Sequence, residues 1–102
     1  MNDEISFSTY LFQDCDDVRA QSKVSVGRGV FRIKPHVSST PFDVLCLFEN
    51  RTTWTILQQR FNGSVNFFRS WSEYKTGFGN FQTEFWLGND RIHQLTRQNN
   101  YR

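Results

Sequence analysis

The stretch that decides the fold covers residues 54–96 and reads WTILQQRFNGSVNFFRSWSEYKTGFGNFQTEFWLGNDRIHQLT. Residues 54–61 are interpreted as a strand with Trp54, Ile56 and Gln58 on one face and Thr55, Leu57 and Gln59 on the other. Asn62-Gly63 follows directly, and this dipeptide is the strongest short hairpin signal because both turn positions need positive φ. We therefore expect a turn at Asn62 and Gly63 and a short returning strand over residues 64–67.

Aromatic side chains in the middle of this stretch repeat at helical spacing. They fall at positions i, i+4, i+7 and i+11 and are Phe67, Trp71, Tyr74 and Phe78. A single apolar stripe of this kind predicts an amphipathic helix. Asn66 is a suitable N-cap and Gly77 a suitable residue just past the C-terminus. Arg69 and Glu73 are expected to form an i,i+4 ion pair on the solvent side.

One more strand and one more helix are expected after this segment. Residues 84–87 include Phe85 and Trp86 and have the apolar character of a buried strand. A turn at residues 88–89 leads to a short helix over residues 90–95, in which Ile92 and Leu95 face inward.

The first half of the chain predicts one helix and two strands. Residues 1–12 show no clear period and are interpreted as a tail or a short docking strand. Acidic residues around Cys15 favour the start of a helix that ends before Val24. Strands are expected over residues 30–34, after a turn at residues 27–29, and over residues 42–49, whose apolar character indicates burial.

Length and charge exclude several classes of protein. The chain has 102 residues, enough for one small domain, and 17% of them are aromatic, so a few side chains can build a core. The net charge is +2 and the basic residues are scattered, which argues against a nucleic-acid binder. The longest apolar run, residues 44–48, is far below the ~20 residues of a membrane-spanning helix. The polar start of the chain predicts no signal peptide.

Two short patterns resemble ligand sites but are incomplete. A calcium loop at residues 14–17 fails because Arg19 stands where such a loop needs Gly and Ser25 where it needs Glu. The segment KTGFGNF at residues 75–81 faintly resembles the aromatic signature of RNA-binding sheets, but it needs two insertions and lies at a predicted helix end. The acidic cluster is therefore interpreted as a helix start, and the aromatic residues as core.

The two cysteines have no CxxC spacing, so they predict neither a zinc site nor a redox motif. Their number alone leaves open whether they are free thiols or a disulfide. A nucleophilic pair with His36 or His93 would need one of these thiols, but the apolar surroundings of Cys46 favour an inert side chain.

Two tripeptides match the acceptor pattern for N-linked glycosylation: Asn50-Arg51-Thr52 and Asn62-Gly63-Ser64. Both lie in predicted turns, which suits exposure. Asn50 and Asn62 are therefore candidate glycosylation sites if the protein is secreted.

Several segments follow one another in the order found in the fibrinogen-like globular domain, and over residues 13–102 the chain resembles that family. The segments are DCDDV (14–18), GVFRIKP (29–35), FDVLC (42–46), WT (54–55), NGSVNF (62–67), W (71), YKTGFGN (74–80), EFWLGN (84–89), IH (92–93) and LT (95–96). The departures are modest. Leu45 replaces a usual Tyr, residues 47–50 replace a usual acidic stretch, and residues 51–53 replace usual glycines.

The resemblance implies an α+β fold in which the chain corresponds to the truncated N-terminal half of the family's domain. A disulfide-linked N-terminal subdomain over about residues 13–53 is expected to precede the first part of a mainly antiparallel sheet with short helices, over about residues 54–102. Cys15 and Cys46 stand where the family carries its first disulfide. The implied core scaffold consists of Trp54, Phe67, Trp71, Tyr74, Phe78, Phe85 and Trp86.

The resemblance also implies a function. Fibrinogen chains, ficolins, invertebrate lectins, tenascins and angiopoietins are extracellular proteins that bind glycans, acetylated groups, receptors or each other, and they are not enzymes. We therefore expect a non-enzymatic, extracellular recognition or adhesion module that is lectin-like in the complete domain. The alternatives are a structural or assembly role in matrix or in a multimer, and a truncated gene product without independent activity.

The same resemblance limits what this chain is expected to bind by itself. In the family, the ligand pocket, the calcium site and a second disulfide belong to the C-terminal subdomain, beyond the matched residues. We expect no catalytic, cofactor-binding or metal-binding residue in this chain, and calcium only in the missing half. The expected partners of the complete domain are glycans or extracellular proteins. Nucleic acid and membrane insertion are not expected, and a homo-oligomer is an open alternative.

Overall fold

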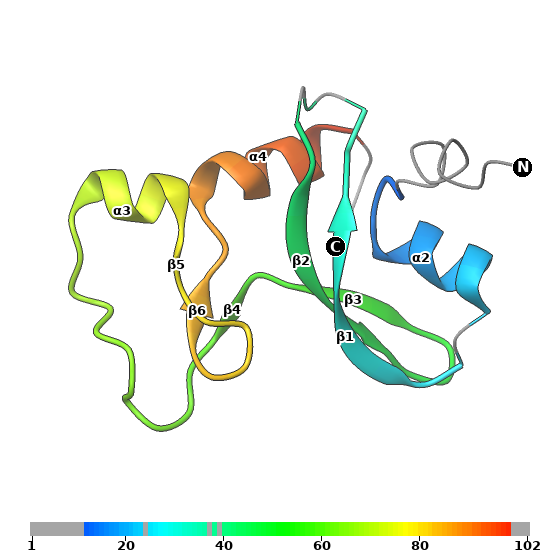
Figure 1. The fold of residues 1–102 in the computed structure, drawn as a ribbon, viewed down its shortest axis with the longest axis horizontal. Helices are drawn as coiled ribbons and strands as arrows, with labels where there is room; N and C mark the ends of the chain where they lie inside the picture. The colour runs from blue at the N-terminus through cyan, green and yellow to red at the C-terminus, as the bar shows by residue number, and fades with distance from the viewer. Residues whose placement is uncertain (1–11, 24, 37, 39, 99–102) are drawn as a thin grey trace, which may run out of the picture.

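The computed structural model describes residues 12–23, 25–36, 38 and 40–98. The predicted tail lies outside these residues except for Phe12, which forms a parallel bridge with Ile33. The strands form two three-stranded sheets, and Figure 1 shows a helix beside each sheet and another helix between them. The strands are β1 (Gly27–Ile33), β2 (Phe42–Phe48), β3 (Thr53–Ile56), β4 (Gln58–Gln59), β5 (Phe78–Gly79) and β6 (Phe85–Trp86), and the helices are α2 (Cys15–Ser22), α3 (Trp71–Thr76) and α4 (Asn89–Gln98).

The helix α2 begins as the acidic cluster predicts. The carboxylate of Asp14 accepts a hydrogen bond from the backbone N–H of Asp17 at 2.9 Å, which caps the first turn. Lys23 ends the helix in the left-handed conformation, with φ of 57°. The disulfide between Cys15 and Cys46 ties this helix to β2, so the pairing implied by the family resemblance is confirmed.

The first sheet has the order β1-β2-β3, and all its pairs are antiparallel. The predicted turn at residues 27–29 is wrong, because Gly27 pairs with Phe48 and Gly29 with Cys46 in the β1–β2 ladder. Seven registered pairs carry β1 along the whole of β2, so the backbone pairing overrides the turn preference of the two glycines.

The strand predicted over residues 54–61 is divided between two sheets. β3 pairs with β2, whereas β4 pairs with β6 in a second antiparallel sheet of order β4-β6-β5. Leu57 lies between them, and its carbonyl accepts a hydrogen bond from the backbone N–H of Leu87 at 2.9 Å. One nearly continuous segment therefore joins both sheets.

The predicted returning strand over residues 64–67 is absent from the described structure, since none of these residues belongs to a strand. The chain wraps instead around the side chain of Glu84, which takes up the backbone N–H groups that a ladder would have used. The hairpin signal at Asn62-Gly63 therefore marks a turn, with Gly63 at φ of 74°, but the partner is a carboxylate and not a strand.

The helix α3 begins later than the aromatic spacing predicts. Its N-cap is Ser70, which forms a capping box with Glu73, while the side chain of Asn66 accepts from the backbone N–H of Phe68 before the helix. Phe67 therefore precedes the helix. The predicted ion pair between Arg69 and Glu73 is present at 3.1 Å.

The core lies between α2, the first sheet and the segment around β6. Its members are Cys15, Val18, Ile33, Phe42, Val44, Leu45, Cys46, Phe48, Phe85, Leu87 and Leu95, with Ile92 and four other residues packed against it. The predicted inward positions of Ile92 and Leu95 on the last helix are confirmed. The α+β fold class, with short helices and antiparallel sheets, is confirmed as well.

Two residues of the predicted core scaffold are placed wrongly by the sequence. Trp71 is 72% exposed and Trp54 is 45% exposed. Trp71 is the first residue of α3, so it does not share a helical face with Phe67, and the indole N–H of Trp54 donates to the exposed carboxylate of Glu49 at 2.9 Å. Phe85 is buried, and the remaining four members are half-buried: Phe67, Tyr74, Phe78 and Trp86.

Candidate interaction surface

The buried carboxylate of Glu84 holds the turn at residues 61–65 in place. Glu84 precedes β6 and is 1% exposed. Its Oε2 accepts hydrogen bonds from the backbone N–H groups of Phe61, Asn62 and Gly63 at 2.5–2.8 Å, and its Oε1 accepts one from Val65 at 3.1 Å. We call residues 61–65 the Glu84 loop, because a single side chain satisfies four of its backbone donors.

These bonds also set the charge state of Glu84. A carboxylate that accepts several backbone N–H bonds is stabilised in its ionised form. The backbone N–H of Phe61 contributes most, and together with those of Asn62, Gly63 and Val65 it lowers the pKa of Glu84 from 4.5 to about 2, against the opposing effect of burial. Glu84 is therefore an anion at any physiological pH, and its role here is structural.

An open hollow lies between the two sheets, with a volume of about 580 Å³. It is lined by Arg28, Gly29, Val30, Leu45, Gln59, Arg60, Phe61, Phe81 and Gln82. Two of its polar side chains are hydrogen-bonded: Arg28 donates to the Oε1 of Gln59, and the amide of Gln59 donates to the carbonyl of Thr83. We call this the inter-sheet hollow.

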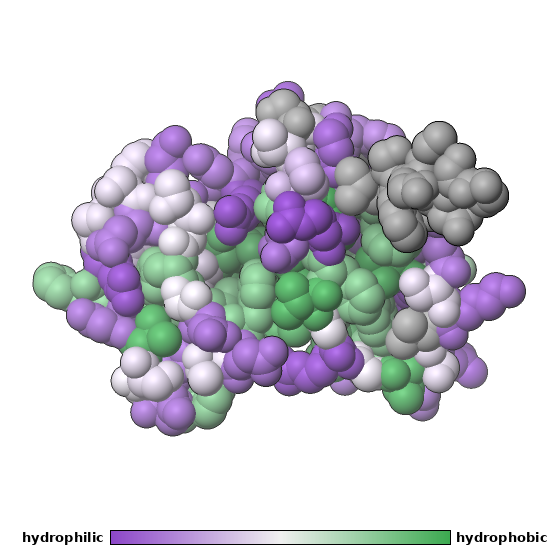
Figure 2. Space-filling view, viewed as in Figure 1, coloured by the Kyte–Doolittle hydropathy of each residue, from purple (hydrophilic) through white to green (hydrophobic). Residues whose placement is uncertain are grey.

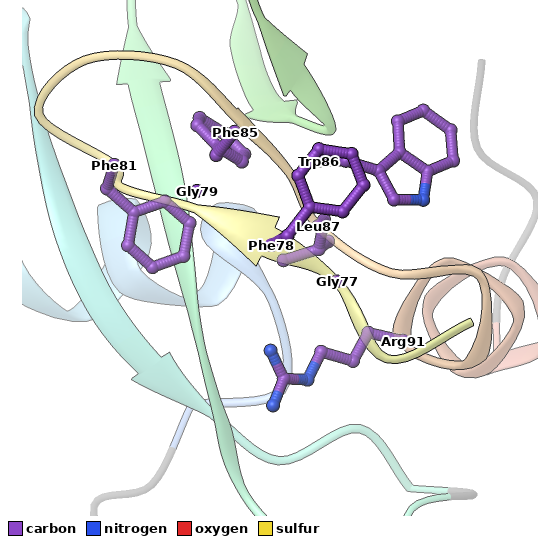
Figure 3. Close-up of a pocket in the computed structure, with 8 residues that line it drawn as sticks. All are labelled: Gly77, Phe78, Gly79, Phe81, Phe85, Trp86, Leu87 and Arg91. Carbon is purple, nitrogen blue, oxygen red and sulfur yellow. The ribbon is translucent and has the colours of Figure 1, made fainter. Parts of the chain in front are cut away.

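A smaller hollow of about 170 Å³ lies along β5 and β6. Figure 3 shows its lining, in which Arg91 extends from α4 as the single charged side chain, apart from the aromatic rings of the two strands. The guanidinium of Arg91 lies 5.6 Å from the centroid of the Phe42 ring. The backbone of Gly79 approaches Phe85 closely, since a Cβ at Gly79 would lie 2.6 Å from the Cα of Phe85. The site thus combines one guanidinium with aromatic and aliphatic surface.

Apolar side chains also lie on the outside of the molecule. Figure 2 shows hydrophobic residues gathered in the middle of one face, between the lobe with α3 and the lobe with α2. The large exposed apolar residues are Val26, Val30, Trp54, Leu57, Phe61, Phe68 and Trp71. Phe68 is 93% exposed and Phe61 is 65% exposed.

The predicted site residues are spread over the molecule and do not form one site. Asn50 lies in the turn between β2 and β3, and Asn62 lies in the Glu84 loop; both are exposed. The two residues that hold these turns, Arg19 and Glu84, were not singled out by the sequence. A charged residue inside an apolar segment, as Glu84 is beside FWL, was the available signal.

The alternative chemistries find little support in this geometry. Both cysteines are bonded to each other, so neither offers the thiol that a Cys–His nucleophile needs. Among the described residues, no group of three or more His, Cys, Asp or Glu side chains could hold a metal ion. Phe78, from the segment compared with RNA-binding sheets, has its ring packed edge-on against Phe67 and Tyr74. No helix within the described ranges is long and apolar enough to cross a bilayer.

Comparison with known families decides what this scaffold is. Residues 11–102 match the family described as the C-terminal globular domain of fibrinogen beta and gamma chains. The chain belongs to the fibrinogen C-terminal domain family. The resemblance of the sequence segments to the fibrinogen-like domain is therefore confirmed.

Individual relatives agree with this membership. The chain is 46% identical to human fibroleukin over 88 residues, to fibrinogen-like protein A of Apostichopus parvimensis over 99 residues, and to mouse microfibril-associated glycoprotein 4 over 89 residues. These alignments cover 85%, 95% and 86% of this chain, but only 20%, 35% and 34% of the relatives. The chain thus spans between a fifth and about a third of their length.

Solved structures show the same relation. The fibrinogen-like globe domain of human ANGPTL2 superposes with a TM-score of 0.76 and 38% identity, covering 87% of this chain and 41% of that one. A lamprey fibrin D-dimer in complex with the peptide ligand Gly-His-Arg-Pro-amide gives a TM-score of 0.76 and 40% identity, covering 89% of this chain and 30% of that one. The fibrinogen-like fold of this chain therefore rests on both sequence and structure.

Proposed function

We propose that this fibrinogen-like chain is the scaffold part of a non-enzymatic, extracellular recognition or adhesion module. The observation that carries the proposal is the family match over residues 11–102, joined to the buried disulfide between Cys15 and Cys46. Disulfides of this kind persist in oxidising compartments and are rare in the cytosol, so the bond supports secretion on physical grounds.

The recognition we propose is lectin-like, with a glycan or an acetylated group as the ligand of the complete domain. The ligand pocket would be supplied by residues beyond those that this chain shares with its relatives, as would any calcium ion. One feature of the described structure supports this division: two of the polar side chains that line the inter-sheet hollow, Arg28 and Gln59, are hydrogen-bonded to each other.

A protein or peptide ligand is the second candidate. The lamprey fibrin structure is a complex with the peptide Gly-His-Arg-Pro-amide. In this chain the exposed aromatic residues, among them Phe68 and Trp71, would favour a role in assembly with other extracellular proteins or with further copies of the same chain.

A glycan array separates the two candidates. The natural protein that contains these residues is labelled and applied to the array, with and without an acetylated sugar as competitor. Binding that the competitor abolishes, and that a protein made of residues 1–102 alone does not show, supports a lectin whose pocket lies outside this chain. Saturable self-association or binding to matrix proteins, with no glycan binding at all, would replace the lectin with the assembly role.

A further inference from the structure

The sequence offers two acceptor tripeptides for N-linked glycosylation, and the structure treats them differently. Both Asn50 and Asn62 are exposed. The turn at Asn50 is fastened by Arg19, whose guanidinium donates to the carbonyls of Glu49 and Asn50. At Asn62 the roles are reversed, because the backbone N–H groups of the turn donate to the carboxylate of Glu84.

The Glu84 loop turns its backbone inward and its side chains outward. Three consecutive N–H groups, those of Phe61, Asn62 and Gly63, converge on one oxygen of Glu84. The side chains of the first two residues face the solvent, since Phe61 is 65% exposed and Asn62 is exposed as well. A large group attached to the side chain of Asn62 would therefore leave the backbone bonds of the loop unchanged.

The acceptor side chain itself has a defined geometry. The Oδ1 of Asn62 accepts a hydrogen bond from the backbone N–H of Ser64 at 3.0 Å, so the asparagine is folded towards the third residue of its own tripeptide. Within the described part of the chain, no hydrogen bond engages the Nδ2 of Asn62. The nitrogen that would carry a glycan is free, and Gly63 between the two residues adds no bulk.

We propose that Asn62 carries an N-linked glycan in the secreted protein; this step rests on the extracellular part of the function proposed above. The donor would be an oligosaccharide linked to a lipid pyrophosphate. The Nδ2 of Asn62 forms a bond to the anomeric carbon of the first sugar, the bond from that carbon to the phosphate oxygen breaks, the lipid pyrophosphate leaves, and one amide proton is released.

The glycan would also decide which part of the surface stays exposed to solvent. A bulky, hydrated group at Asn62 keeps the Glu84 loop and the neighbouring ring of Phe61 at the solvent boundary. Neither a partner protein nor the rest of the domain would then pack directly over this turn. The exposed apolar residues away from the turn, such as Phe68 and Trp71, remain available for contact.

Peptide mapping tests the site directly. The natural protein is produced in animal cells with a secretion signal, and the tryptic peptide of residues 61–69 is examined by mass spectrometry. Asn-Gly sequences deamidate spontaneously, and this reaction gives the same product as enzymatic glycan release, so the readout is the intact glycopeptide. We expect the glycosylated peptide to account for most of the population, whereas an unmodified peptide 61–69 throughout overturns the proposal.

Matched variants assign the glycan to the residue. N62Q and S64A should each remove one glycan mass from the intact protein, and N50Q should retain the glycan at residue 62. Neither N62Q nor S64A removes a backbone N–H bonded to Glu84, so both are expected to fold. If a variant is retained in the cell, the same peptide is read from the membrane fraction. An unchanged glycan mass in both N62Q and S64A contradicts the assignment, whatever the glycan array shows about function.

Discussion

Glu84 shows how one side chain can replace a strand. A returning strand would have satisfied the N–H groups of residues 61–65 through a ladder, and the carboxylate satisfies four of them through its two oxygens. Because the acceptor is ionised, each bond is stronger than a neutral one. The loop therefore holds its shape without a partner strand.

Replacing Glu84 with Gln should loosen this loop and destabilise the fold. The amide keeps one acceptor oxygen but turns an NH₂ group towards N–H donors, which leaves buried donors without partners. We expect the midpoint of thermal unfolding of the natural protein to fall by about 5 °C or more, measured by circular dichroism. The control is E49Q, since Glu49 is exposed and accepts one bond from Trp54. Equal effects of the two substitutions would contradict the role given to Glu84.

The lowered pKa of Glu84 predicts a dependence of stability on acid. Its pKa falls from 4.5 to about 2 on folding, so its contribution is complete above about pH 4.5 and is lost as the pH falls to about 2. Denaturant unfolding between pH 5 and pH 2 should show a steep loss of stability that is missing in E84Q. The pKa of Glu73 is also lowered, mainly by the backbone N–H of Ser70, so E73Q should remove part of the same loss, and a smaller part because Glu73 is half-exposed. Identical pH profiles for the natural protein and E84Q would refute the prediction.

Gly79 and Gly63 differ in how closely other backbone atoms approach them, so substitution of each by Ala measures the effect of that approach. Both have positive φ, at 94° and 74°, but a Cβ at Gly79 would collide with the carbonyl of Glu84 and the Cα of Phe85, whereas one at Gly63 meets nothing within 4 Å. We expect G63A to cost about 1 kcal/mol in the free energy of unfolding, from the backbone alone. G79A should cost more than about 2 kcal/mol, because strands β5 and β6 must also separate. Chemical denaturation of both variants checks this, and a smaller loss for G79A than for G63A would contradict it.

At the scale of elements, Arg19 connects α2 to the turn between β2 and β3. Its guanidinium donates to the carbonyls of Thr52, Ser25, Glu49 and Asn50 and to the hydroxyl of Thr53. The fork of five donors is what allows one side chain to reach so many acceptors. The helix is thus fastened to the sheet at its C-terminal end by Arg19 and at its N-terminal end by the disulfide.

Replacing Arg19 with Lys keeps the charge but loses the fork, and it should lower the free energy of unfolding by about 1–2 kcal/mol. Equilibrium denaturation of R19K in the natural protein measures the loss. R97K is the control, because Arg97 lies on the exposed side of α4. A change in R19K no larger than in R97K would show that the bonds of Arg19 contribute little.

The elements that the sequence predicts well are those with strong local signals. The acidic start of α2, the apolar run of β2 and the two inward residues of α4 are all found in the structure. The predictions for residues 27–29 and 64–67 failed because distant partners decide them: a long ladder with β2 in one case and the carboxylate of Glu84 in the other. Hydrogen bonds between residues about 20 positions apart leave no periodic trace in the sequence.

The functional surface was still harder to predict. The resemblance placed the disulfide and the family correctly, but the two hollows are assembled from β1, β2, β4, α4 and the segments around β5 and β6. Spacing along the chain does not show which of these side chains meet. The exposure of Trp54 and Trp71 was missed for a related reason, since a stripe of aromatic residues predicts a covered face only if something in the same structure covers it.

At the scale of the whole molecule, large aromatic side chains near two small sheets are exposed to solvent. The edges β4 and β5 of the second sheet are two residues long, and large apolar side chains are exposed beside them. Open edges and uncovered aromatic surface favour association. We therefore predict that a protein of residues 1–102 alone is marginally stable or pairs with another chain.

Light scattering after size-exclusion chromatography and a thermal scan test this prediction. Association should be reduced in F68S/W71S, which removes two of the most exposed rings, and retained in S72A, which changes an exposed polar residue nearby. A monomer that unfolds in one cooperative transition at neutral pH would show that the exposed aromatic surface needs no cover.

The disulfide between Cys15 and Cys46 has a mechanical consequence. It closes a span of 31 residues, so a force applied to the two ends of the chain passes from sulfur to sulfur and leaves that span unloaded. At about 3.3–3.6 Å per residue, roughly 100 Å of chain is withheld from extension until the bond is reduced. Under tension, α2, β1 and most of β2 therefore lie in a closed loop that cannot lengthen, and only the segments outside residues 15–46 can lengthen as the load rises.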